Sequence, residues 1–178
     1  EEGARESVRG IGYLATWLGE FSSGNYKDTT LIYAEARCRP YVLMAGGLSD
    51  DERALLHRAC DVIAGGRFDS PQPSRCRDVA RIHGDLWSGN VLWSPSGVVL
   101  IDPAAHGGHR ITDLAMLALF GTPHLARIHA AYDEASTWLP DGWRELIGLH
   151  QLHPLLVHAD LFGGGYGAQA IEVARRYA

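Results

Sequence analysis

The pattern of apolar and polar residues predicts helices over much of the chain, most clearly over 48–66. Ser49 and Glu52 stand three residues apart at its start, which is the spacing of a capping box that closes the first helical turn. Gly65–Gly66 follow the last apolar position and are expected to end the helix. The apolar face repeats at helical spacing and consists of Leu55, Leu56, Ala59 and Ile63.

The remaining segments are mostly helical as well. The stretch 31–45 has a helical pattern that Pro40 is expected to interrupt, because proline has no backbone N–H group. Asp113 stands at a capping position before an apolar run and is expected to begin a helix there. Before these segments, 10–21 is typical of a short strand and 22–30 of a loop, and 68–78 has the proline content of a linker. Helices are expected at 113–121, 123–135, 142–162 and 167–178.

Two short runs, 90–93 and 98–101, have the composition of strands. The residues between them include Pro95 and Gly97, which suit a tight turn. We therefore expect one small β-hairpin within an otherwise helical region.

Three oxygen-bearing side chains converge on one end of this hairpin. Pairing of the strands places Asn90 near Asp102, and Asp85 lies in the loop just upstream. Asparagine and aspartate oxygens are ligands that Mg²⁺ accepts, and a further carboxylate beside the metal can take the proton of a hydroxyl group. This is the arrangement used in phosphoryl transfer. Asp85 and Asn90 could also be simple turn formers, but the presence of Asp102 downstream argues against that alternative.

The composition narrows the possible partners. The 178 residues carry 46% hydrophobic residues and a net charge of −5, which argues against a nucleic-acid partner held through its phosphates. No apolar run is long enough for a membrane span, and the charged N-terminal stretch does not resemble a signal peptide. Three widely spaced cysteines predict reduced thiols in the cytoplasm rather than disulfides.

The motifs "HGDLWSGN" and "LIDPAAHGGHRITDLAM" resemble those of the fructosamine (ketosamine) kinases, a branch of the aminoglycoside-phosphotransferase-like and protein-kinase-like enzymes. The segments "YAEARCRPY" and "LLVHADLFGGGYGAQA" are similar to that branch too, so the resemblance covers about Tyr33 to Tyr177. It implies an α+β, protein-kinase-like fold. Residues 33–178 would form the mostly helical C-terminal lobe with its small hairpin, and 1–32 a remnant of the N-terminal lobe with hinge and linker.

The resemblance also implies a role for each matching residue, with ATP and Mg²⁺ as cofactors. Asp85 would be the catalytic base, and Asn90 and Asp102 the metal ligands. His83 would brace the catalytic loop, while Asp113 would cap its helix and hold the backbone of that loop. The implied ATP-binding residues are Thr16, Trp17, Leu18 and Leu92, and the implied substrate-binding residues are Trp87, His106 and Arg110.

The front of the chain departs from the family pattern. Such kinases use a strand lysine and a helix glutamate to hold the phosphates, whereas Lys27 lies in a loop-like segment after the hinge-like stretch. We therefore expect most of the nucleotide-binding lobe to be missing from this sequence.

Two classes of function follow. The first is an ATP-dependent kinase that phosphorylates a sugar hydroxyl of small-molecule or protein-linked ketosamines, or alternatively an aminoglycoside or other amino alcohol. The second is a non-catalytic kinase-like binding module.

The histidines of "HQLHPLLVH" (150–158) are a weak zinc candidate, because Pro154 is expected to break the helix between them and no Cys or acidic ligand accompanies them. Trp87 is either a packed aromatic residue or a substrate contact.

Overall fold

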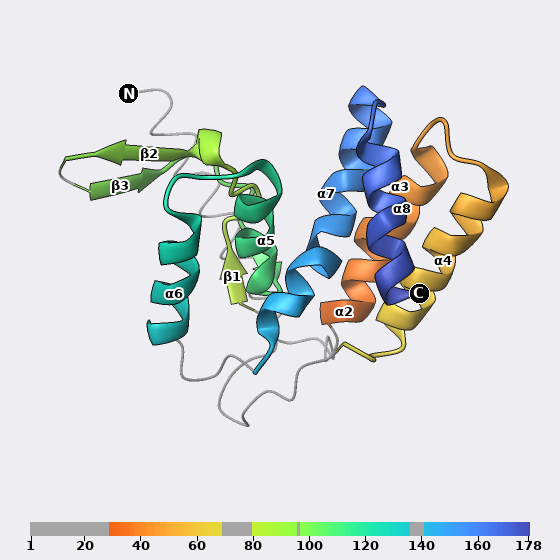
Figure 1. The fold of residues 1–178 in the computed structure, drawn as a ribbon, viewed down its shortest axis with the longest axis horizontal. Coiled ribbons are helices and arrows are strands. Elements are labelled where there is room, and N and C mark those ends of the chain that lie inside the picture. The colour runs from red at the N-terminus through yellow and green to blue at the C-terminus, as the bar shows by residue number, and fades with distance from the viewer. Residues whose placement is uncertain (1–28, 69–79, 96, 136–140) are drawn as a thin grey trace.

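The computed structural model describes residues 29–68, 80–95, 97–135 and 141–178, and it is mostly helical. Figure 1 shows a bundle of helices on one side and short helices with β-strands on the other. The long helix α7 (Leu146–Phe162) packs against both parts through α8 and α5. The other helices are α2 (Thr29–Ile32), η1 (Tyr33–Cys38), α3 (Arg39–Met44), α4 (Asp50–Ala64), η2 (Ser88–Asn90), α5 (Ile111–Phe120), α6 (Leu125–Ala135), η3 (Trp143–Glu145) and α8 (Tyr166–Tyr177). The strands are β1 (Ala80–Ile82), β2 (Val91–Ser94), β3 (Gly97–Leu100) and β4 (His106–Gly108).

Helix α4 begins with the capping box that the sequence predicts. The Ser49 hydroxyl accepts a hydrogen bond from the Glu52 N–H, and the Glu52 carboxylate accepts one from the Ser49 N–H at 2.8 Å. These bonds satisfy donors that the first helical turn leaves unpaired. The helix ends at Ala64 with Gly65 as its C-cap residue, so both predicted ends are confirmed.

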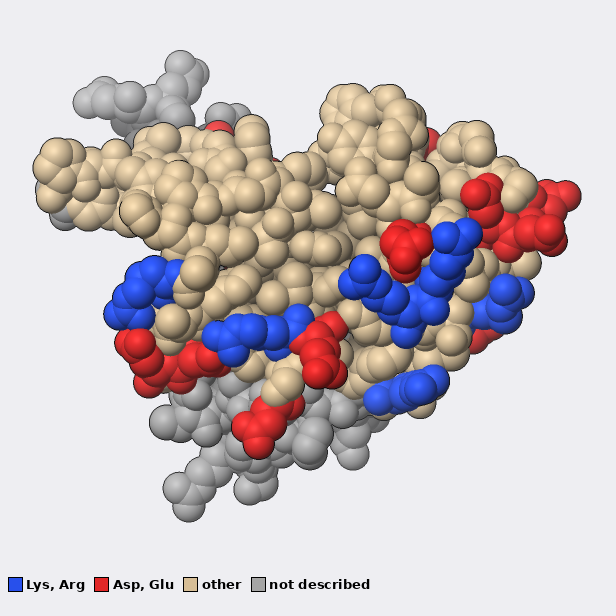
Figure 2. All heavy atoms as spheres, in the orientation of Figure 1, with Lys and Arg blue, Asp and Glu red and all other residues tan. Residues whose placement is uncertain are grey.

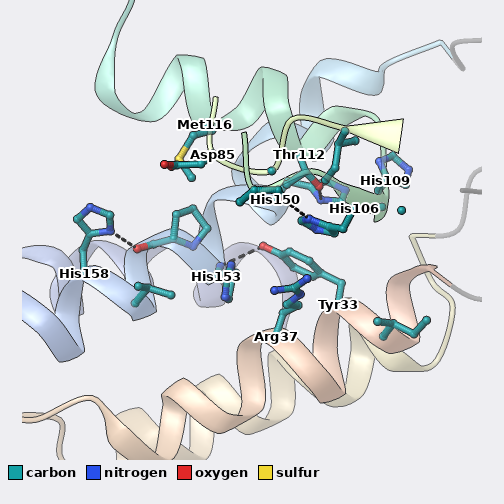
Figure 3. A pocket seen from close by; sticks show the side chains of 18 residues that line it. Tyr33, Arg37, Asp85, His106, His109, Thr112, Met116, His150, His153 and His158 are labelled. Atoms are coloured by element: carbon teal, nitrogen blue, oxygen red, sulfur yellow. Dashed lines mark hydrogen bonds between the residues drawn. The ribbon is translucent and has the colours of Figure 1, made fainter. Parts of the chain in front are cut away.

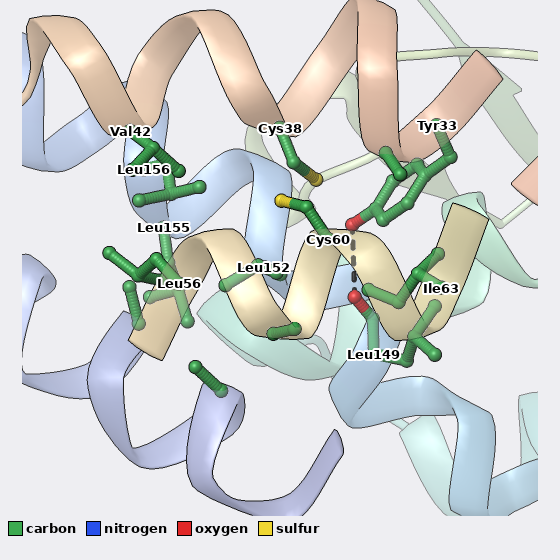
Figure 4. Close-up of a cluster of buried hydrophobic side chains, with 14 of the residues drawn as sticks. Tyr33, Cys38, Val42, Leu56, Cys60, Ile63, Leu149, Leu152, Leu155 and Leu156 are labelled. Atoms are coloured by element: carbon green, nitrogen blue, oxygen red, sulfur yellow. Dashed lines mark hydrogen bonds between the residues drawn. The ribbon is translucent and has the colours of Figure 1, made fainter. Parts of the chain in front are cut away.

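The main hydrophobic core lies inside the bundle of η1, α3, α4, α7 and α8 (Figure 4). Leu56 and Leu156 are fully buried there, as are the thiols of Cys38 and Cys60. Neither cysteine is in a disulfide, and burial raises the pKa of the Cys60 thiol to about 11. The third cysteine, Cys76, lies outside the described residues.

The predicted interruption at Pro40 is wrong. The chain stays helical from Thr29 to Met44, but its central part is a π-helix in which the Arg39 N–H donates to the Ala34 carbonyl. Pro40 then lies at the start of α3, directly after the π-helical segment.

Pro154 likewise lies inside α7, contrary to the predicted break. The Tyr33 hydroxyl lies one turn before this proline and joins the two helices. It donates to the Leu149 carbonyl at 3.0 Å and accepts from the His153 N–H at 3.0 Å. A side chain from η1 therefore completes a turn of α7, as happens where a proline disturbs a helical hydrogen-bond ladder.

The predicted hairpin is confirmed, with β2 and β3 antiparallel and Val91 opposite Leu100. A second antiparallel pair, β1 with β4, aligns Ile82 with His106. The sequence analysis did not predict this pair, because each strand has only three residues and β4 has the composition His-Gly-Gly. It connects the loop that contains Asp85 to the segment after Asp102.

The β2–β3 hairpin projects from the body of the structure (Figure 1). Its exposed side chains include Leu92 at 49% and Val99 at 54%. Figure 2 shows charged side chains along the lower and right-hand parts of one face, whereas the hairpin side of that face carries few.

None of the described helices is long and apolar enough to cross a membrane. The predicted strand over 10–21 lies outside the described residues, and the domain division at 32/33 stays a prediction.

Candidate active site

The loop between β1 and β2 carries Asp85, and it can form only with glycine at position 84. Gly84 has a φ of +84°, and a Cβ atom there would lie 2.3 Å from the Ala104 carbonyl oxygen. That atom would also lie 2.8 Å from Nδ1 of His106. The glycine therefore lets the loop pack directly against the segment between β3 and β4.

Asp113 holds the backbone of this loop from the first turn of α5. Its two carboxylate oxygens accept hydrogen bonds from the backbone N–H groups of His83 at 2.7 Å and Gly84 at 2.9 Å. The prediction that Asp113 also caps its own helix is wrong, because α5 begins at Ile111 with Arg110 as the N-cap residue. The carboxylate instead satisfies donors of a segment about thirty residues upstream, and bonds to a charged acceptor are among the stronger ones.

His83 contacts both the Asp85 loop and Ile101, the residue that follows β3. Its Nδ1 atom accepts from the Asp85 N–H at 3.4 Å, and its Nε2 atom lies 2.9 Å from the Ile101 carbonyl oxygen. Since Nδ1 is an acceptor here, the tautomer that satisfies both contacts carries its proton on Nε2. The imidazole thus links the start of the loop to the residue before Asp102.

Asn90 is buried and orients the Asp85 side chain. Its Nδ2 group donates to the Asp85 backbone oxygen at 2.8 Å and to the carboxylate Oδ2 at 3.1 Å. The Asn90 backbone carbonyl accepts from the Ile101 N–H at 3.1 Å. The structure therefore brings Asp85, Asn90 and the start of the Asp102 segment together, as the hairpin argument predicts.

Asn90 and Asp102 have the donor chemistry that Mg²⁺ requires. The Nδ2 group of Asn90 donates to Asp85, so the Oδ1 oxygen is the atom of this side chain that could serve as a ligand. Asp102 is exposed, and its φ of +49° is uncommon for a residue other than glycine. No group of three or more His, Cys, Asp or Glu in the described ranges could hold a metal by itself. Two protein oxygens still fit Mg²⁺, since this ion keeps waters and shares phosphate oxygens.

A cavity of about 320 Å³ opens beside Asp85 (Figure 3). Its walls come from the Asp85 loop, β4, α5, η1 and α7. Figure 3 shows Asp85 beside Met116 on one side, and Tyr33 with Arg37 on the other. Five of the lining side chains are imidazoles, namely those of His106, His109, His150, His153 and His158.

Most of these imidazoles are held in the neutral form. Burial lowers the pKa of His109 to about 4, and the nearby Arg110 charge adds to the effect. Burial, with contributions from Arg37 and His106, likewise lowers the pKa of His153 to about 4. The pKa values of His106 and His150 are also lowered, again mainly by burial. A neutral imidazole both donates and accepts hydrogen bonds, as a polyhydroxyl ligand requires.

Two of the histidines form one stacked unit at the base of the cavity. The rings of His109 and His150 lie 4.4 Å apart at 23°. His150 is held further by a contact of 3.1 Å between its Nδ1 atom and the Thr112 hydroxyl. The contact between Thr112 and His150 connects α5 to α7 at this wall of the cavity.

Only part of the predicted substrate and nucleotide set lies at the cavity. His106 lines it, whereas Trp87 and Arg110 are not among the lining residues. The Trp87 side chain is 42% exposed, and its ring lies over Gly89, where a Cβ atom would be 2.3 Å from the indole. Leu92 is exposed on the hairpin. Three of the predicted ATP-binding residues, Thr16, Trp17 and Leu18, lie outside the described residues.

The sequence analysis missed the wall opposite Asp85. Tyr33 and Arg37 stand four residues apart on one helical segment, and His150 and His153 stand three apart on α7. Helical spacing could have indicated that each pair shares a face. It could not have shown that the two faces meet.

Comparisons with known proteins identify the family to which the chain is similar. The family model described as fructosamine kinase matches residues 55–177. A mouse ketosamine-3-kinase is 29% identical over 180 residues, covering 98% of this chain and 56% of that protein. A candidate ketoamine kinase from Klebsiella pneumoniae is 39% identical over 104 residues, covering 58% of this chain and 78% of that protein.

A solved structure has the same architecture. The crystal structure of a candidate fructosamine-3-kinase from Thermobifida fusca superposes with a TM-score of 0.72 at 50% identity, over 82% of this chain and 49% of that one. The mostly helical architecture with small antiparallel sheets thus belongs to the protein-kinase-like fold. The chain spans about half the length of this protein (49%) and of the mouse relative (56%).

Proposed function

The chain belongs to the fructosamine kinase family, and on this premise we propose that it takes part in ATP-dependent phosphorylation of a ketosamine. The acceptor is a hydroxyl group of the sugar part. The observation that carries the proposal is the Asp85 carboxylate, oriented by Asn90 and placed at a cavity lined by neutral imidazoles.

The proposed reaction assigns one proton transfer to Asp85. The acceptor hydroxyl donates its hydrogen bond to the Asp85 carboxylate, which takes the proton as the oxygen attacks the γ-phosphorus of ATP. A new O–P bond forms, the bond from the γ-phosphorus to the bridging oxygen breaks, and ADP leaves with that electron pair. Asn90 fixes which carboxylate oxygen faces the cavity, because its amide occupies Oδ2.

The nucleotide and metal parts of the site are proposed from the residue types. Asn90 and Asp102 would hold Mg²⁺, and Leu92 would contact the adenine from the hairpin. The bound ion would neutralise the charge that develops on the phosphate oxygens. Asp113 and His83 act on the protein side, because they fix the loop that presents Asp85.

The cavity favours a ketosamine over the two alternatives. Aminoglycosides carry several ammonium groups and need several carboxylates, whereas Asp85 is the only carboxylate among the described lining residues. A non-catalytic module has no need for an oriented carboxylate beside a cavity lined by imidazoles. The relatives named for ketosamine or ketoamine kinases support the same choice.

The decisive variant is Asp85→Asn in the full-length protein. We expect kcat to fall about 10²- to 10⁴-fold, because the amide cannot take the proton. ADP release with a fructosamine acceptor measures it, and the exposed Asp160→Asn on α7 is the matched control. Full turnover by a folded Asp85→Asn protein would refute the assignment of the base. Turnover of an aminoglycoside but of no ketosamine would show that the protein is an aminoglycoside kinase. Turnover of no acceptor would show that it is a non-catalytic module.

A further inference from the structure

Arg37 is a cation in the cavity that has no partner among the described residues. It lines the cavity and is half-buried, and it forms no hydrogen bond or ion pair with the part of the chain that the structure describes. Arg39, two residues later, differs in that it pairs with both Glu35 and Asp61 at 2.8 Å. A half-buried guanidinium that offers its donors to a cavity is a binding group for an anion.

Arg37 faces the cavity from a π-helix. Residues Tyr33–Cys38 form this wider helical segment, and both Tyr33 and Arg37 line the cavity from it. Single π-turns inside α-helices are rare and recur at functional sites. In Figure 3 the Arg37 side chain reaches toward His153, beside the Tyr33 ring.

Arg37 lies away from the reacting end of the cavity. Figure 3 places Asp85 next to Met116 on one side and Arg37 next to Tyr33 on the other, with histidine rings between them. Among the described lining residues, Arg37 is the only arginine or lysine and Asp85 the only carboxylate. The cavity thus carries one positive and one negative group, separated by mostly neutral imidazoles whose pKa values burial lowers.

This inference rests on the proposed function and names its substrate class. We propose that Arg37 binds a carboxylate on the amine-derived part of the ketosamine while the sugar hydroxyl lies at Asp85. The preferred acceptors are then sugar adducts of amino acids that keep a free carboxylate near the modified nitrogen. A planar guanidinium binds a carboxylate through two parallel hydrogen bonds, which gives direction as well as affinity. The group transferred from ATP must reach the hydroxyl at Asp85, so it does not occupy the Arg37 side.

A pair of acceptors that differ only in the carboxylate tests the proposal. Isothermal titration calorimetry would measure the binding of Nα-fructosylglycine and of fructosylglycinamide to the protein without ATP. We expect the acid to bind about ten- to a hundredfold more tightly than the amide, as for hydrogen bonds between charged groups. Arg37→Met should remove this preference, and Arg37→Lys should keep part of it. Arg58→Met on the exposed side of α4 removes an equal charge outside the cavity and should leave the preference unchanged.

The outcomes separate this inference from the proposed function. Equal affinities for the acid and the amide in the wild-type protein would overturn the role of Arg37, as would a preference that survives in folded Arg37→Met. Absence of binding for both compounds would overturn it too. Circular dichroism verifies the fold of each variant. If Arg37→Met does not fold, the test is the affinity of Arg37→Lys for the acid and the amide, and an undiminished preference for the acid would overturn the role of Arg37. Carboxylate-dependent binding without any phosphorylation would support Arg37 while removing the proposed kinase activity.

Discussion

The helical bundle and the Asp85 loop are stabilised in different ways. The bundle is held by close packing of apolar side chains from α4, α7 and α8, many of them fully buried. The loop is positioned by hydrogen bonds instead. Asp113 and His83 accept hydrogen bonds from its backbone N–H groups, and the Asn90 amide donates to Asp85. Packing tolerates gradual change at a cost in stability, whereas a directional hydrogen bond is either made or lost. Substitutions in the bundle should therefore lower stability, and substitutions around the loop should lower activity.

The first effect is expected in the bundle. Leu156→Ala removes a fully buried side chain from α7 and should lower the free energy of unfolding by about 2–5 kcal/mol. The kinetic constants of the protein that remains folded should not change. Urea unfolding measures the loss, and Leu43→Ala, at a side chain that is 67% exposed, should change stability by less than about 0.5 kcal/mol. A large fall in kcat for folded Leu156→Ala would contradict the expectation that substitutions in the bundle affect stability alone.

The second effect is a loss of stability in acid that originates in the cavity wall. The folded pKa of His109 and of His153 is about 4, below the ordinary 6.5. The unfolded chain therefore binds these protons first, and the stability that is complete above pH 6.5 is lost as the pH falls toward 4. The loss at pH 4 approaches about 3 kcal/mol for each residue. His109 faces His150 and Arg110, and His153 faces Arg37 and His106.

Unfolding by urea at pH 7, 6, 5 and 4 measures this loss. A double variant, His109→Asn with His153→Asn, should show a much weaker dependence on pH over that range. His124→Asn, at an exposed position, should behave like the wild-type protein. Equal pH dependence in the double variant and the wild type would show that acid acts elsewhere in the molecule.

The third effect concerns the hydrogen bonds of the loop. Asp113→Asn keeps the size of the side chain, but its amide nitrogen would face one of the two N–H groups that the carboxylate now accepts. We expect kcat to fall about ten- to a hundredfold, which corresponds to one lost bond to a charged acceptor. The thermal midpoint should fall only slightly.

A matched control for this prediction is Asp133→Asn. Asp133 also accepts hydrogen bonds, from the Trp143 indole and from Arg144, but it lies near the small cluster around Trp143 rather than at the loop. Its substitution should lower the thermal midpoint with little change in kcat. If Asp133→Asn lowered kcat as much as Asp113→Asn, the loop would not be the sensitive element.

How much the sequence could predict depends on the distance between interacting residues. The capping box of Ser49 and Glu52 and the β2–β3 hairpin involve neighbours along the chain, and both were predicted. The Asp85–Asn90 contact spans five residues, and the sequence predicted that these side chains lie at the same end of the hairpin. The wall formed by Arg37 and the histidines of α7 depends on a π-helix and on tertiary packing. No local pattern indicates either of these, so the sequence did not show that wall.

The Tyr33 hydroxyl restricts which sequences this fold can accept. It satisfies one donor and one acceptor of α7 from a different helix, next to a proline. Phenylalanine would keep the ring but leave the Leu149 carbonyl and the His153 N–H without this partner, and serine would keep the hydroxyl without its reach. Tyr33 is therefore expected to have a structural role at this turn of α7, although it takes no part in the proposed proton transfer. A designer who varies the cavity for a new acceptor should keep this tyrosine fixed and change the residues around it.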